Sequence, residues 1–97
     1  MAQEAINSVQ KIITIIFDKW RLPEDKRDAL SNTDDKKRII WRIHERLWAL
    51  FRDHESIAQW LREPNRSLDG KTPLEMFDIN IWAVVDLAEE MNNPSFT

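Results

Sequence analysis

An all-α fold, a compact bundle of five to six helices, is predicted by three features of the sequence. Apolar residues recur at spacings of three and four over several stretches, which is typical of helices that turn one face toward a core. Residues that favour helix starts precede these stretches. No segment shows the alternation expected of a half-buried strand. A chain of 97 residues is expected to form a single domain, 1–97.

The first predicted helix spans residues 2–20 and has a wide apolar sector. One face follows the helical spacing and consists of Ile6, Val9, Ile13, Ile16 and Trp20. Ile12, Ile15 and Phe17 extend the apolar surface beyond what one core contact requires. We therefore expect this helix either to be buried between others or to pack its second face on another copy of itself. The β-branched residues leave a strand over 12–17 as an alternative.

Two further helices are predicted over residues 23–30 and 34–52. Pro23 is placed at the first position of the shorter helix, where its fixed φ suits a helix start. Either Asn32 or Thr33 caps the longer helix. The apolar side of the longer helix consists of Ile39, Ile40, Ile43, Leu47, Leu50 and Phe51.

The stretch 60–74 concentrates the special backbone chemistry of the chain, because it holds the only glycine and two of the four prolines. A fourth helix, capped by Asp53, is expected to end at Pro64. Asp69 and Gly70 then form a turn in which the glycine adopts a positive φ. The residues of the fourth helix that are expected to point inward are Ile57, Trp60 and Leu61.

The last two helices are expected over residues 73–77 and 81–91. Thr72 caps the first of them, a proline occupies its first position, and Glu75 completes a capping box. Asn80 caps the final helix. The apolar side of the final helix consists of Ile81, Val84, Val85, Ala88 and Met91.

Composition and charge exclude several function classes. The chain has no cysteine and no apolar run long enough for a bilayer, so a cytoplasmic protein without a membrane partner is expected. Its net charge of −3 has the wrong sign for a protein that coats nucleic acid. By count of acids and bases, residues 1–33 are neutral, residues 34–52 carry +3 and residues 53–97 carry −6. The acidic half suits a basic partner or a phosphate-binding pocket; a solvated face is the alternative.

Catalysis has little support in the sequence. There is no cysteine or tyrosine nucleophile and no glycine-rich phosphate loop. His44 and His54 lie in different predicted helices, without metal-ligand spacing, and each is expected at the surface. We therefore predict that the protein is not an enzyme and has no catalytic, cofactor or metal site.

The tryptophans indicate a second aromatic surface. Trp20 and Trp60 fit core faces. Trp41 and Trp48 share a face because they are seven residues apart, and that face is displaced from the apolar side of their helix. Trp82 is displaced in the same way from its helix's core side. These residues either contact another molecule or are buried on a second side of the bundle.

A spaced set of residues around the glycine resembles a known signature. It consists of Trp60-Leu61, Pro64-Asn65, Leu68, Gly70 and Thr72-Pro73-Leu74. The set is similar to the W-L-x-x-P-N…L-x-G-x-[ST]-P-L signature of the toxin-binding domain in Xre/MbcA/ParS-type antitoxins. Those proteins neutralise RES-domain toxins, which degrade NAD or transfer ADP-ribose from it. The resemblance covers roughly residues 12–92 and is strongest after about residue 39.

The resemblance implies an antitoxin-like module that occludes the active site of a cognate RES-type toxin, with residues 34–97 as the toxin-binding part. The acidic and apolar carboxyl-terminal half is expected to cover or enter the NAD pocket. A second copy of the chain is the other expected partner. The residues expected to contact the toxin are Trp82, Asp86, Glu89, Glu90, Phe96 and Asn65.

The alternative function is a DNA-binding transcriptional regulator of the helix-turn-helix class. The sequence from Trp20 to Leu30 resembles the entry to that motif, so residues 1–33 are interpreted as a shortened remnant of it. The separate recognition helix is deleted or absorbed into the predicted helix over 34–52. The residues expected to contact phosphate in weak DNA binding are Lys36, Lys37, Arg38 and Arg42.

Overall fold

Six α-helices and one short 3₁₀ helix make up the computed structural model, which describes the backbone of residues 2–92 and the side chains of residues 9–92. In chain order the elements are α1 (Ala2–Trp20), α2 (Glu24–Ser31), α3 (Asp34–Phe51), α4 (His54–Trp60), η1 (Arg66–Leu68), α5 (Pro73–Ile79) and α6 (Ile81–Met91). The described residues contain no β-strand. The all-α prediction is confirmed, and the alternative strand over 12–17 is wrong because those residues lie inside α1.

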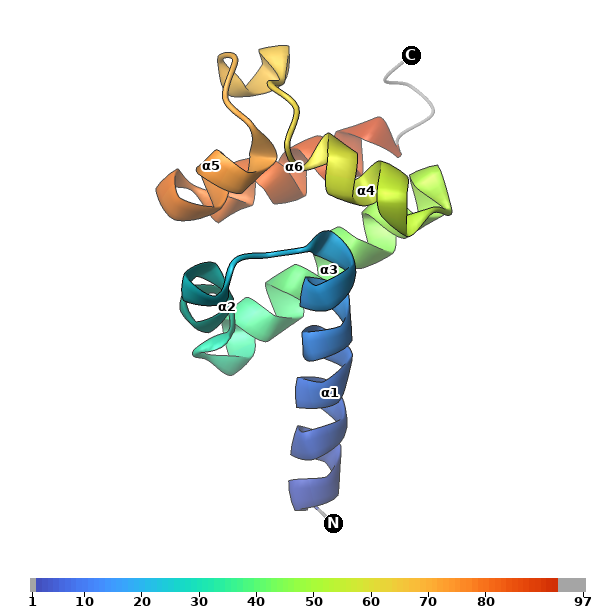
Figure 1. Cartoon of the computed structure of the whole chain (residues 1–97), viewed down its shortest axis with the longest axis vertical. Helices are drawn as coiled ribbons and strands as arrows, with labels where there is room; N and C mark the ends of the chain where they lie inside the picture. Colours follow the sequence, from blue (N-terminus) through green and yellow to red (C-terminus); the bar gives the residue numbers. More distant parts are fainter. Residues whose placement is uncertain (1, 93–97) are drawn as a thin grey trace.

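The long helix α3 organises the molecule, since α1, α2, α4 and α6 all pack against it (Figure 1). It contributes Ile40, Ile43 and Leu47 to the core, and each is fully buried. The radius of gyration is 13.5 Å, close to the value of about 13 Å that a compact domain of this size adopts. The longest dimension is nevertheless 44 Å, because the amino-terminal half of α1 extends beyond the other helices (Figure 1).

Helix α1 joins the core through its carboxyl-terminal half. Its buried residues are Ile13, Ile16, Phe17 and Trp20. Val9, predicted on the core face, is instead 46% exposed, because the part of α1 that carries it projects past the body of the molecule. Phe17, which was not assigned to the core face, is buried. The side chain of Ile6 lies outside the described residues.

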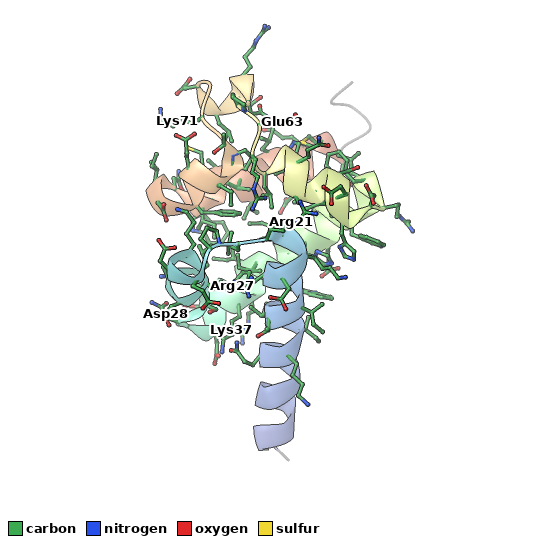
Figure 2. The ribbon with its side chains drawn as sticks, viewed as in Figure 1. Arg21, Arg27, Asp28, Lys37, Glu63 and Lys71 are labelled. Atoms are coloured by element: carbon green, nitrogen blue, oxygen red, sulfur yellow. The ribbon has the colours of Figure 1, made fainter. Side chains whose placement is uncertain are left out.

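Helix α2 starts one residue later than predicted, so Pro23 is its N-cap and not its first helical residue. Its backbone is extended there, with φ −60° and ψ 150°. Arg27 holds α2 against the end of α1, because its Nε donates to the carbonyl of Leu22 at 2.8 Å and its guanidinium pairs with Asp18 at 2.6 Å (Figure 2). Thr33 caps α3 by accepting a hydrogen bond from the backbone N–H of Lys36 at 3.1 Å.

The chain reverses between α3 and α4 at Arg52, which lies in the left-handed region with φ 56°. Asp53 caps α4 as predicted, accepting from the N–H of Ser56 at 3.0 Å and from its hydroxyl at 2.7 Å. Leu50 was predicted on the apolar side but is 42% exposed. It lies one turn beyond Arg46, the residue of α3 that the carboxyl-terminal end of α6 contacts, so α6 does not cover it.

The corner between α4 and α5 projects from one end of the molecule (Figure 1). Helix α4 ends at Trp60, earlier than the predicted end at Pro64. An isolated bridge joins Asn65 to Lys71, and Gly70 has the positive φ of 82° that the turn requires.

The predicted capping box opens α5, which runs two residues further than expected. Thr72 Oγ1 accepts from the N–H of Glu75, and Glu75 Oε1 accepts from the N–H of Thr72, both at 3.1 Å. Asn80 caps α6 by accepting from the N–H of Trp82 at 3.2 Å. Val84, Val85 and Ala88 are buried as predicted, together with Leu87, which the pattern missed.

Candidate partner-binding surface

One face of α6 presents an aromatic and acidic stripe to solvent. Trp82 is 52% exposed, and Asp86 and Glu90 follow it at intervals of four residues, so the three side chains lie on one side of the helix. Ile79 at the end of α5 is 62% exposed and precedes the stripe. The core side of α6 is occupied by Val84 and its neighbours, which fixes the outward orientation of this stripe.

Glu89 differs from the other acids of α6, because its side chain is half-buried. It forms a close ion pair with Arg42 of α3, although the contact does not have the geometry of a hydrogen bond. Asn92 adds to this junction by donating from Nδ2 to the carbonyls of Arg46 at 2.8 Å and Ala88 at 2.9 Å. Glu89 therefore contributes to the contact between α3 and α6. Phe96, the other predicted contact at this end, lies outside the described residues.

Asn65 braces the projecting loop. Its Oδ1 accepts from the N–H of Ser67 at 2.9 Å, and its own N–H donates to the carbonyl of Lys71 at 3.0 Å. Its carbonyl accepts from Leu68 and Gly70, each at 2.9 Å. The side-chain oxygen of Asn65 therefore braces the backbone, which is one of the two roles that an amide can have in a tight loop.

The four basic residues predicted to contact phosphate do not form one free stripe on α3. Lys36 donates from Nζ to the carbonyl of Ala29 at 2.9 Å, Arg38 lies 3.6 Å from Asp35, and Arg42 pairs with an acid of α6. Lys37 lines a groove beside α1. Helix α3 starts three residues after α2 ends and runs on without a break, so the described chain contains no separate recognition helix at this point.

Trp41 and Trp48, which were predicted to share a helix face, belong to an aromatic cluster whose other members the sequence did not predict. The ring of His44 lies 5.9 Å from Trp41, 6.3 Å from Trp48 and 6.4 Å from Trp20, measured between centroids. His54 of α4 stacks on His44 at 6.2 Å with an interplanar angle of 13°. The expectation that both histidines lie free at the surface is wrong: both are half-buried, because α1 and α4 close over this side of α3.

Burial lowers the pKa of His44, and the electrostatic effect of neighbouring His54 lowers it further. The spacing of Trp41, His44 and Trp48 was the available signal for this cluster, since side chains three and four apart meet on a helix. The contribution of His54 depends on the chain reversal at Arg52. Among the described residues there is no group of three or more side chains suited to hold a metal ion.

Fold and surface define a small all-helical domain that exposes an aromatic and acidic helix face. Residues 46–87 match the family model of the antitoxin Xre/MbcA/ParS C-terminal toxin-binding domain. This part of the chain, from the end of α3 into α6, is therefore similar to the toxin-binding domain of that antitoxin family. Neither a curated protein nor a solved structure matches the chain. Among the helices that the structure describes, none contains an apolar stretch that could span a lipid bilayer.

Proposed function

We propose that this protein neutralises a RES-type, NAD-consuming toxin by occluding its active site, with α6 as the contacting element. The match of residues 46–87 to a toxin-binding domain carries the proposal. The signature around Gly70 supports the RES class, because it resembles that of antitoxins paired with such toxins. Trp82 and Asp86 lie inside the matched segment and are exposed, while Glu90 follows it directly.

The chemistry of the stripe supports an occlusion mechanism. A toxin that consumes NAD must bind a pyrophosphate through basic groups, and residues 53–97 carry a net charge of −6. Asp86 and Glu90 would take the place of the phosphates, and the indole of Trp82 would fill an apolar part of the pocket. A large aromatic side chain that is exposed alone and buried in a complex is a frequent source of binding energy.

On this proposal the protein acts by binding alone, needs no cofactor and is not an enzyme. It acts in the cytoplasm, where NAD is consumed, and as a homodimer. The apolar outer face of α1 supports the homodimer, since Ile12 and Ile15 are exposed and continuous along the helix.

Surface plasmon resonance against a RES-type toxin tests the toxin-binding proposal. We expect Trp82→Ala to weaken binding by about 30-fold or more, and the double charge reversal Asp86→Lys/Glu90→Lys to do the same mainly by faster dissociation. Release of the toxin's NAD consumption should follow both changes. Unchanged affinity in both variants, with a RES-type toxin that the wild type binds, would overturn the mechanism; a wild type that binds no RES-type toxin would overturn the toxin class.

Matched control variants separate the loss of a direct toxin contact from the general effects of removing an indole or reversing two charges. Trp41→Ala removes an indole that is 43% exposed, close to the exposure of Trp82, but lies on α3 outside the matched segment. Asp25→Lys/Asp28→Lys makes the same change of charge as the double reversal, on exposed positions of α2. Both controls should retain wild-type affinity within about threefold if the binding surface is α6.

A further inference from the structure

A second exposed apolar surface lies on the opposite part of the molecule, along the projecting half of α1. Val9, Ile12 and Ile15 are 46%, 42% and 56% exposed. Beside them a groove of about 420 Å³ runs between α1 and α3. It is lined by Val9, Ile12, Ile13, Asp34, Lys37, Arg38 and Trp41. Figure 2 shows Lys37 beside α1.

This surface is distinct from the candidate toxin-binding face. Every residue that lines the groove precedes residue 46, where the toxin-binding match begins. Single exposed apolar side chains are normal on a soluble protein, but several in a row on one helix beside a groove indicate an interface. We infer that two copies of this chain associate here, with their α1 helices antiparallel about a two-fold axis.

The spacing of the exposed residues sets the register of the pair. Ile12, Ile15 and Lys19 follow each other at intervals of three and four, the spacing of a seam between two helices. A two-fold axis at the level between residues 13 and 14 places Ile12 of one copy against Ile15 of the second copy, and the reverse. A two-fold contact is self-complementary, so one stripe supplies both halves of the interface.

Charge complementarity supports a second copy as the occupant. Lys11 and Asp18 are seven residues apart and lie on the same flank of the seam. In the antiparallel register Lys11 of one copy faces Asp18 of the second copy, so two opposite-charge pairs form. Asp18 Oδ1 accepts a hydrogen bond from the Arg27 guanidinium at 2.6 Å, and the second carboxylate oxygen is left for such a pair. Among the described side chains Lys11 has no acidic partner.

The inference specifies the surface of the homodimer proposed above and stands independently of toxin capture. A helix of 19 residues is about 28 Å long, so the interface is small and association in the micromolar range is expected. Sedimentation equilibrium of the full chain alone, over about 1 to 500 µM, measures it. A wild-type chain that stays monomeric across this range overturns the inference.

Ile15→Glu is the informative substitution, because it places two carboxylates in the seam while changing a side chain that the monomer leaves exposed. We expect the dimer to weaken at least about tenfold, with an unchanged helical circular dichroism spectrum. Ile79→Glu is the matched control, since Ile79 is also exposed but lies on α5. Equal self-association of the wild type and Ile15→Glu would contradict the proposed surface.

A charge swap tests the register. Lys11→Glu should weaken the dimer, and adding Asp18→Lys in the same chain should restore it, because the two pairs then form with reversed signs. In a parallel pair Lys11 and Asp18 of the two copies would not meet, so the double variant would not recover. No recovery in the double variant therefore overturns the antiparallel arrangement.

The two proposals fail separately. Ile15→Glu should bind sparsely immobilised toxin within about threefold of the wild type, whereas Trp82→Ala should lose toxin and keep the dimer. Loss of self-association without loss of toxin binding supports both assignments of surface. Loss of toxin binding in both variants would place α1 in the toxin interface and contradict the assignment made here.

Discussion

His44 is a titratable side chain whose surroundings favour its neutral form. Trp20 of α1, Trp41 and Trp48 of α3 and His54 of α4 surround its ring. Burial has the largest effect in lowering its pKa, the electrostatic effect of His54 lowers it further, and the neighbouring Glu45 raises it. The folded pKa is thus below the ordinary value of 6.5, so the unfolded chain binds more protons in the interval between the two values.

The free energy of unfolding should therefore fall as the pH decreases through 6.5 toward the lower pKa of the folded state, because protonation of His44 favours the unfolded state in this interval. The urea midpoint at several pH values measures it, and His44→Leu should show a weaker dependence. Asp53 does not affect the stability in this pH range, because hydrogen bonds from Ser56 lower its pKa from 3.8. Its contribution to the free energy of unfolding is lost only at more acidic pH. An equal pH dependence of wild type and variant would remove His44 as the cause.

Thr72 is the side chain on which the start of α5 depends. Its Oγ1 accepts from the N–H of Glu75 and its own N–H is bound by the Glu75 carboxylate. We expect Thr72→Ala to lower the free energy of unfolding by about 1 kcal/mol, measured by urea denaturation with unchanged m. Thr14→Ala on the exposed side of α1 is the control and should change stability by less than about 0.5 kcal/mol. Equal losses in the two variants would contradict a capping role.

At the scale of elements, the sequence predicted what depends on neighbouring residues and missed what depends on distant ones. The caps Asp53 and Thr72 were predicted correctly, and Thr33 was one of two candidates for its helix, because a helix start is specified within four residues. Which side of a helix is covered depends on where other helices end. Val9 is uncovered and Leu50 is exposed for that reason, although both fit the apolar spacing.

The reversal between α3 and α4 carries a backbone cost at Arg52. A residue with a Cβ in the left-handed region costs about 1–2 kcal/mol, and glycine avoids this cost but has a more flexible unfolded state. We therefore expect Arg52→Gly to raise the free energy of unfolding by about 0.5–1 kcal/mol. The same substitution at Arg46, inside α3, should lower it by about 1 kcal/mol. Urea denaturation of the pair measures the opposite signs, and destabilisation by both would contradict the left-handed strain.

For the molecule as a whole, the candidate site was predictable only in part. The displacement of Trp82 from the apolar side of its helix left it either exposed or buried on a second side of the bundle, and the structure shows it exposed. Glu89 was grouped with the free acids, since no local pattern shows that Arg42 of α3 lies against it. The groove beside α1 was missed for the same reason: it joins residues far apart in the chain.

The distribution of charge over the whole molecule argues against a regulator that reads DNA sequence. The net charge is −3, and three of the four predicted phosphate contacts already have partners within the chain. If Lys36, Lys37 and Arg38 still reach phosphate, three contacts give a loss of about 40-fold in affinity between 50 and 200 mM salt. We expect weak binding of this kind, equal for promoter and scrambled duplexes, in fluorescence anisotropy. A promoter preference above about 100-fold would restore the regulator, because backbone contacts alone carry no sequence information.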